Sequence, residues 1–136
     1  EHSGRLVLGG NACGGELADG YFIEATVFAD VDPASSLAQN EIFGPVLSII
    51  PFESEDEGLQ IANSTSFGLT NYVQTRDIAR ARRLARQLHS GTVSINGTPN
   101  MHVGAPFGGV GLSGIGREGG KEGLLEFIST KTVLIR

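Results

Sequence analysis

The run from Val46 to Phe52 constrains the fold of this 136-residue chain more than any other segment, because nearly all of its residues are apolar. Such a run is typical of a strand that is buried on both faces of a sheet. The sequence EIFGP at 41–45 precedes it and places an acid and an aromatic residue two positions apart before a Gly-Pro corner. A carboxylate beside a buried strand is costly unless it is paired or binds something. Glu41 and Phe43 are therefore the first candidate site residues.

Strand-like and helix-like segments alternate along the chain. Runs rich in β-branched and aromatic residues predict strands at 5–8, 21–31, 46–52, 69–74, 92–95 and 131–135. Polar or amphipathic segments predict a short helix ending near 39 and helices at 54–63, 77–89 and 118–127, whereas 96–116 is expected to be irregular. This alternation indicates βαβ units, so we expect an α/β fold with a mostly parallel sheet and flanking helices, undivided by any linker.

The composition argues against several classes of partner. The formal net charge is −5, which disfavours binding to a nucleic-acid backbone. No apolar run approaches the roughly 20 residues needed to cross a bilayer, so no membrane partner is expected. Cys13 is the only cysteine and cannot form an internal disulfide, which favours a cytoplasmic protein. Met101 is the only methionine, so we expect a piece of a longer polypeptide or a processed product.

Neither the histidines nor the cysteine predict a reactive centre. His2, His89 and His102 have no metal-ligand spacing to one another or to Cys13, so no metal site is expected. Cys13 lies in a glycine-rich stretch without a charged residue before Glu16, and a reactive thiol needs an activating neighbour. We expect an inert loop thiol, with a thiol enzyme as the alternative.

Two overlapping Gly-x-Gly-x-x-Gly matches occur at 109–114 and 114–119. In a dinucleotide-binding fold this motif directly follows a strand, opens a helix and has an acid ~20 residues later. Neither match has this context, because Ser129 and Leu134 stand where the acid should be. A glycine-rich loop folded tightly over a sheet is the favoured interpretation.

Glu41 and Phe43 are better candidates for binding a nucleotide. The two oxygens of a carboxylate can accept hydrogen bonds from both hydroxyls of a ribose. An aromatic side chain beside them can pack on a flat heterocycle. The alternative is that Glu41 caps a turn and Phe43 packs in the core, and the sequence pattern does not exclude it.

The chain resembles the NAD(P)-dependent aldehyde dehydrogenase superfamily over nearly its whole length. The motif EIFGPV at 41–46 is unchanged, and Ala25 and Gly111 stand where proline and lysine are usual. The other matching segments follow the family's order: GG at 9–10, GYF at 20–22 with TVF at 26–28, AN at 62–63 with FGL at 67–69, GTVSIN at 91–96, PFGG at 106–109 with SG at 113–114 and GRE at 116–118, and KTV at 131–133.

The resemblance implies a fold, a reaction and site residues. Residues 1–128 would be the incomplete C-terminal part of a catalytic domain, and 129–136 an oligomerisation strand. The parent enzyme would oxidise a small-molecule aldehyde to a carboxylic acid with NAD or NADP, through a cysteine thiohemiacetal. Glu41 would hold the hydroxyls of the nicotinamide ribose, Phe43 would pack beside the nicotinamide, and Phe107 would lie near the aldehyde. The strand from Lys131 to Ile135 would pair across the interface of a homo-oligomer.

The same resemblance places the nucleophilic cysteine, the general-base glutamate and the cofactor domain upstream of these residues. We therefore expect no catalytic residue in this chain and no activity from the chain alone. The alternative is a non-catalytic module that self-associates or binds a partner through its exposed edge strand.

Overall fold

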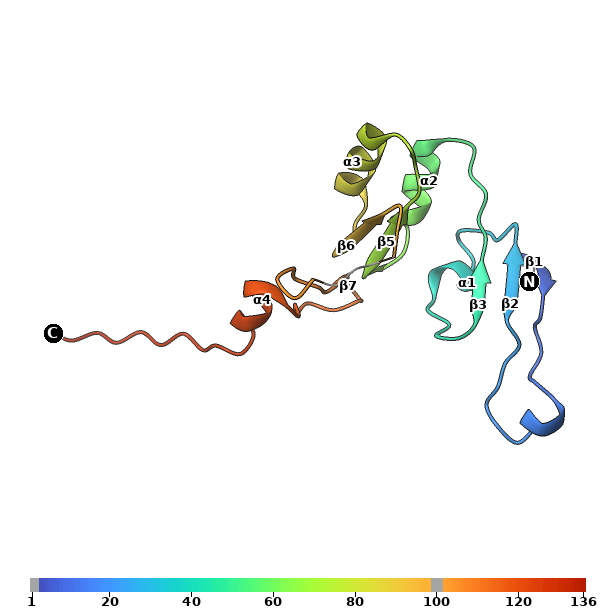
Figure 1. Ribbon diagram of the computed structural model, residues 1–136, viewed down its shortest axis with the longest axis horizontal. Coiled ribbons are helices and arrows are strands. Elements are labelled where there is room, and N and C mark those ends of the chain that lie inside the picture. The colour runs from blue at the N-terminus through green and yellow to red at the C-terminus, as the bar shows by residue number, and fades with distance from the viewer. Residues whose placement is uncertain (1–2, 99–101) are drawn as a thin grey trace. The chain divides into compact units, whose positions relative to one another are not determined.

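The computed structural model describes residues 3–98 and 102–136 (Figure 1). Although no linker was expected, the chain gathers into two compact units, which meet in sequence between Thr65 and Ser66. Each unit contains its own strands and helices. The site residues Glu41 and Phe43 belong to the first unit and Phe107 to the second.

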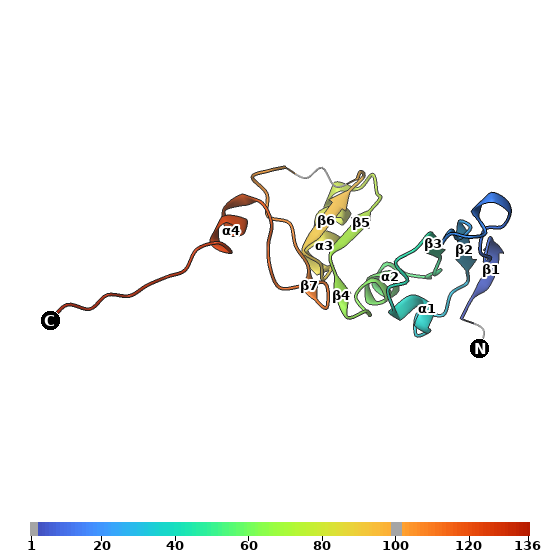
Figure 2. The same ribbon diagram turned by 90° about the horizontal axis from the view of Figure 1, so that it is seen from below.

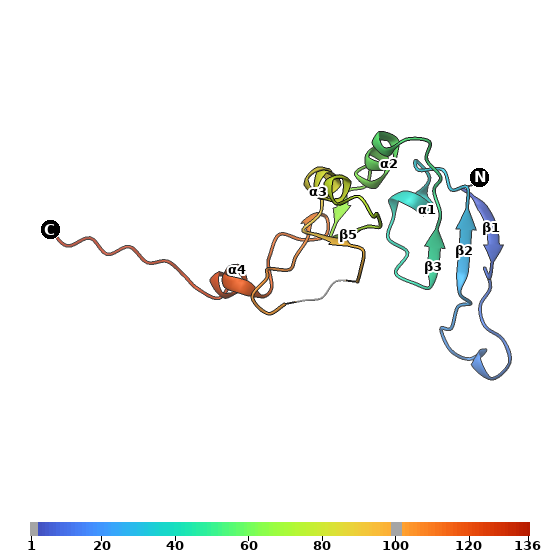
Figure 3. The ribbon, with the colours of Figure 1, turned by 45° about the horizontal axis from the view of Figure 1, so that its top comes forward.

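The first unit is built on a three-stranded mixed sheet. Its strands are β1 (Arg5–Leu8), β2 (Thr26–Ala29) and β3 (Val46–Ser48), in that spatial order (Figure 3). β2 runs parallel to β3, but β1 is antiparallel to β2, so the expectation of a mostly parallel sheet is wrong for this strand. The physical reason is that β1 and β2 are joined by a folded-back loop containing the 3₁₀ helix η1 (Gly15–Leu17), without a crossover helix. The helices α1 (Ser36–Gln39) and α2 (Glu55–Ala62) complete the unit.

Thr26 ties the glycine pair at 9–10 to β2. Its side chain is only 4% exposed, and its hydroxyl accepts a hydrogen bond from the Gly10 N–H at 2.9 Å. The same hydroxyl donates to the Glu24 carbonyl at 2.8 Å. A buried hydroxyl with both roles satisfied stabilises the local backbone, and here it joins the GG segment to the TVF segment.

The second unit contains a βαβ element. β5 (Thr70–Val73) and β6 (Thr92–Ile95) pair in parallel and are connected through α3 (Ile78–Gln87). β5 and β6 lie side by side in Figure 2. α3 contacts β5, and both Ala81 of α3 and Val73 of β5 are buried. β4 (Phe67–Gly68) pairs with β7 (Val110–Gly111), and α4 (Gly120–Leu125) follows. This unit confirms the predicted βαβ arrangement, although its strands form two small sheets.

Three predicted strands differ from the observed ones, and the strand predicted at 21–31 is limited to β2. β3 is shorter than the predicted 46–52, and Leu47 is 58% exposed, so β3 is not buried on both faces within this chain. Backbone pairing continues to Ile49, whose N–H donates to the Phe28 carbonyl, and Pro51 has no N–H with which to extend it. Residues 131–135 form no strand in this single chain. An edge strand acquires its ladder only when another strand pairs with it.

Candidate functional site

The segment 41–45 forms the corner that leads into β3. The Thr26 N–H donates to the Pro45 carbonyl and the Val46 N–H donates to the Gly44 carbonyl, each at 2.8 Å. The first bond fixes the C-terminal side of the corner to β2 and the second lies within the corner, while all five residues of the segment remain exposed. The corner is therefore anchored to a sheet and accessible at the same time.

Phe43 is held in an unusual conformation at this corner. Its φ is +52° and its side chain is 92% exposed. The left-handed region costs a residue other than glycine roughly 1–2 kcal/mol and is rare for bulky side chains. Phe43 is therefore not part of a core formed by the described residues. Glu41 is also exposed, so a carboxylate and an aromatic ring are both available at the start of β3.

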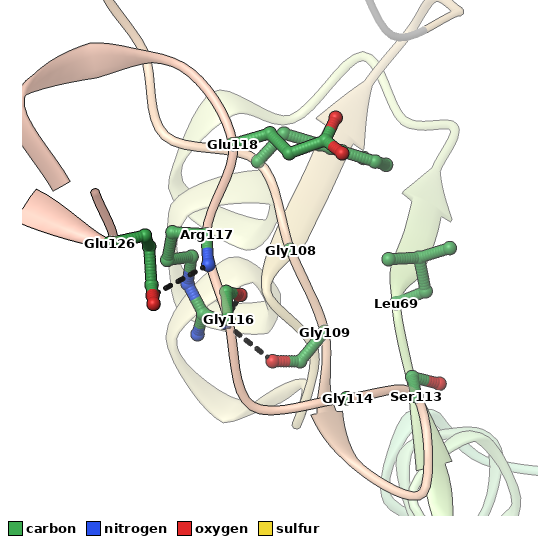
Figure 4. Close-up of a pocket in the computed structure, with 10 residues that line it drawn as sticks. Leu69, Gly108, Gly109, Ser113, Gly114, Gly116, Arg117, Glu118 and Glu126 are labelled. Carbon is green, nitrogen blue, oxygen red and sulfur yellow. Dashed lines mark hydrogen bonds between the residues drawn. The ribbon is translucent and has the colours of Figure 1, made fainter. Parts of the chain in front are cut away.

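Phe107 lines an open cleft of about 380 Å³ in the second unit (Figure 4). Backbone of the glycine-rich segment forms much of the lining, and Leu69 contributes apolar surface. Charged side chains add one cation and two carboxylates. The lining residues are Leu69, Phe107, Gly108, Gly109, Ser113, Gly114, Gly116, Arg117, Glu118 and Glu126.

Two segments of this lining are bonded to each other. Phe107 and Glu118 exchange backbone hydrogen bonds in both directions, each 2.7 Å long. The Arg117 Nη1 donates to the Gly109 carbonyl at 2.7 Å and to the Gly116 carbonyl at 2.8 Å. Sequence reasoning did not select Arg117. The GRE motif was the available signal, but a motif does not reveal that the partners are backbone carbonyls.

The turn after β7 accounts for the glycine at 111. Gly111 has φ +59°, and a Cβ there would overlap the Ser66 carbonyl oxygen. The Ser113 hydroxyl accepts from the Gly68 N–H at 3.0 Å, and the Leu112 N–H donates to the Ser66 carbonyl at 2.9 Å. The first Gly-x-Gly-x-x-Gly match is therefore a tight loop folded against β4, as the sequence favoured. The lysine usual at 111 would be strained in this turn.

The remaining candidates show no assembled centre. Cys13 is half-buried, and its N–H donates to the Phe22 carbonyl at 2.8 Å. Among residues 3–98 and 102–136, no three His, Cys, Asp or Glu side chains are grouped as metal ligands. No helix within the same residues is long and apolar enough to cross a membrane. Of the three histidines, His2 lies outside the described residues.

Comparison with known proteins decides the family, because the model of the aldehyde dehydrogenase family matches residues 1–133. The chain belongs to the aldehyde dehydrogenase family. A solved aldehyde dehydrogenase from Mycobacterium tuberculosis, complexed with NAD+, is 45% identical with a TM-score of 0.88 and is matched by 98% of this chain. The likeness to these enzymes supports an α/β fold of the aldehyde dehydrogenase type.

Relatives with established names include several kinds of aldehyde dehydrogenase. The betaine aldehyde dehydrogenase of Cereibacter sphaeroides is 46% identical over 97% of this chain. The geranial dehydrogenase of Castellaniella defragrans is 47% identical over 96% of it. This family member spans only 27% of the length of each of these two relatives, and 27% of the Mycobacterium tuberculosis structure.

Proposed function

We propose that this chain is the C-terminal part of a longer aldehyde dehydrogenase that oxidises an aldehyde to a carboxylic acid with NAD or NADP. Residues 1–128 would complete the catalytic domain, and residues 129–136 would form the oligomerisation strand. The observation that carries the proposal is the exposed acid and aromatic pair, Glu41 and Phe43, on an anchored corner of a family member. The structure of a relative in complex with NAD+ supports the choice of cofactor class.

The residues at the corner fit the nicotinamide end of such a cofactor. The exposed Glu41 carboxylate has two acceptor oxygens for the two hydroxyls of a ribose. The exposed Phe43 ring offers an apolar face to a flat heterocycle, and its fixed backbone limits the loss of freedom on binding. When bound, the cofactor accepts the hydride that the aldehyde loses. The contribution of Glu41 and Phe43 is to bind and orient it.

Phe107 is proposed to contact the aldehyde. It lies in the cleft with Leu69, and apolar side chains of this kind can contact the carbon chain of a substrate. The nucleophile is proposed to come from another part of the longer polypeptide. Cys13 lies in the loop between β1 and β2, and we assign it no catalytic role.

The test is aldehyde-dependent formation of reduced nicotinamide by the complete polypeptide, followed by absorbance. Replacing Glu41 by Gln keeps the size of the side chain but removes its charge and one acceptor oxygen. Since hydrogen bonds to charged groups contribute about 1.5–3 kcal/mol, we expect E41Q to raise the KM for the cofactor at least tenfold, by about 1.4 kcal/mol or more. Glu16→Gln, an exposed acid of η1, is the matched control and should leave this KM unchanged.

Different outcomes test the proposed activity, the role of Glu41 and the location of the nucleophile. Absence of aldehyde-dependent activity in the complete polypeptide would overturn the proposed function. An unchanged cofactor KM in E41Q would overturn only the assignment of Glu41. Activity of the isolated 136-residue chain would show that the nucleophile lies within it, and Cys13→Ala would then test the thiol directly.

A non-catalytic module is the second candidate. It is favoured by the apolar side chains exposed near the C-terminus, including Val133, Leu134 and Ile135. An antibody against the last six residues would show the size of the natural polypeptide in cells. A species several times larger than this chain supports the enzyme, and a species of its own size supports the module.

A further inference from the structure

Arg117 binds two backbone carbonyls through its guanidinium. It is half-buried in the wall of the cleft, and Nη1 donates both to Gly109 and to Gly116 (Figure 4). Among the described residues, no carboxylate lies within ion-pair distance of this guanidinium. One side chain therefore joins the loop that carries Phe107 to the segment that carries Arg117 itself.

The guanidinium also covers the residue next to Phe107. A Cβ built on Gly108 would stand 2.9 Å from both Cδ and Nη1 of Arg117, so the arginine packs directly on this glycine. Phe107 is held on its other side by the paired backbone bonds to Glu118. The backbone on both sides of the Phe107 side chain thus depends on residues 117 and 118.

Glu126 in turn holds Arg117. Its Oε1 accepts from the Arg117 N–H at 3.2 Å, and Glu126 is the residue that caps the C-terminus of α4. Hydrogen bonds between a backbone N–H and a carboxylate are stronger than neutral ones. The contact links the position of the arginine backbone to the short helix that precedes the C-terminal segment.

We propose that Arg117 is a positioning residue for the aldehyde, acting through Phe107. The inference rests on the proposed function, since it assumes that Phe107 contacts the substrate. If Arg117 fixes the loop at 107–109, its loss lets the ring of Phe107 move away from its place in the cleft. Displacement of a positioning group by about 1 Å can reduce catalytic efficiency by about a hundredfold. Binding of the cofactor depends on other residues and should be unaffected.

The experiment uses the complete polypeptide and three variants. Arg117→Met keeps much of the apolar stem and removes all donors, whereas Arg117→Lys keeps a charge that can reach a carbonyl. We expect Arg117→Met to raise the aldehyde KM about tenfold or more, with a loss of catalytic efficiency of up to about a hundredfold as Phe107 is displaced, and with the cofactor KM unchanged. Arg117→Lys should recover part of the loss. Arg82→Met, on the exposed side of α3, is the control and should have no effect.

A double-mutant cycle with Phe107→Leu tests the route of the effect. If Arg117 acts through the ring, Arg117→Met should add little to the aldehyde KM of Phe107→Leu, because coupled residues are not additive. Hydrogen exchange gives a readout independent of turnover. The amides of Phe107 and Glu118 should lose protection in Arg117→Met, while those of β5 and β6 keep it.

The possible failures are distinguishable. If the unsubstituted polypeptide shows no aldehyde-dependent turnover, the proposed function is wrong, and the positioning role that rests on it falls with it. With turnover, the positioning role is overturned by an unchanged aldehyde KM, by equal changes in the aldehyde and cofactor KM, or by full additivity with Phe107→Leu. If Arg117→Met does not fold, Arg117→Lys decides: a raised aldehyde KM with an unchanged cofactor KM supports the role, and unchanged constants overturn it.

Discussion

Asn96 joins the ends of β5 and β6 beyond their last paired residues. Its Nδ2 donates to the Thr75 carbonyl and its Oδ1 accepts from the Thr75 N–H, each at 2.8 Å. The backbone has φ +54°, which asparagine adopts more readily than most residues. We predict that Asn96→Ala lowers the free energy of unfolding by about 1–3 kcal/mol, from the lost bonds and the strained backbone. Urea denaturation of the complete polypeptide measures this change.

Two further substitutions at Asn96 separate the causes. Asn96→Gly relieves the backbone but lacks both side-chain bonds, and Asn96→Asp keeps the acceptor but loses the donor. Asn96→Gly should be more stable than Asn96→Ala and less stable than the unsubstituted protein. Asn96→Asp should be less stable than the unsubstituted protein, because its second carboxylate oxygen faces the Thr75 carbonyl. Equal stability of the alanine variant and the unsubstituted protein would show that the Thr75 contacts contribute nothing.

The site residues differ in how far the sequence could reveal them. Glu41 and Phe43 were selected because an acid and an aromatic stand before an apolar run, and both are exposed at the corner as a binding role requires. Phe107 was selected only through the family resemblance. Arg117 was missed as a functional residue because its partners are the carbonyls of Gly109 and Gly116. Every residue has a carbonyl, so the sequence does not indicate which ones a side chain will bind.

At the scale of the elements, the N-terminus of α3 is stabilised by the residue that precedes its first turn. Asp77 is the N-cap, and its Oδ1 accepts from the Ala79 N–H at 2.8 Å and the Arg80 N–H at 3.1 Å. The bond from the Arg80 N–H is the largest cause that holds the pKa of Asp77 below its usual 3.8, opposed by desolvation. The Ala79 N–H and the charges of Arg80 and Arg83 also lower this pKa.

A lowered pKa in the folded state has a definite consequence for stability. The unfolded chain binds the proton more tightly, so the contribution of Asp77 is present above pH 3.8 and is lost as the pH falls through the lower folded value. We predict that Asp77→Ala lowers the melting temperature near neutral pH and that the difference shrinks in acid below 3.8. Circular dichroism across pH measures both effects. Asp77→Asn, which keeps the cap oxygen, should remain close to the unsubstituted protein; a loss as large as that of the alanine variant would contradict the capping argument.

Short sequence patterns predicted helices and strands well where all the residues that form the element lie in this chain. A helix was expected at 54–63, and α2 is found there with Ser54 as its N-cap, whose hydroxyl accepts from the Glu57 N–H at 3.2 Å. The strand predicted at 92–95 was found as β6. The helix predicted at 118–127 shrank to α4, because Gly119 and Gly120 have positive φ and delay its start. Strand direction was not local information, since it depended on how β1 folds back on β2.

At the scale of the whole molecule, few hydrophobic residues are buried and many are exposed, as is expected when further protein segments cover them. The buried hydrophobic residues of the described chain are Val31, Val73 and Ala81. Large apolar side chains are exposed instead, among them Tyr21, Ile115, Phe127 and Ile135. Exposed apolar surface of this kind marks contacts with other protein segments. It agrees with the 27% of the relatives' length that the chain spans, and with the proposal of a longer enzyme.

The C-terminal segment offers the sharpest test of assembly. The sequence of residues 131–135 is typical of a β-strand, and these residues are exposed, with Leu134 89% exposed. Their backbone groups are therefore available to pair with another chain. Alternate N–H groups of a strand point to opposite edges. One of the neighbouring substitutions Thr132→Pro and Val133→Pro must therefore remove an N–H that faces the partner.

We predict that at least one of these proline variants shifts the complete polypeptide to a smaller assembly, because proline cannot donate to a ladder. Light scattering after size-exclusion chromatography measures the mass of each variant. Val133→Ala keeps the N–H and should retain the assembly of the unsubstituted protein, which separates backbone pairing from side-chain packing. If both proline variants keep the original mass, residues 131–135 do not pair across an interface.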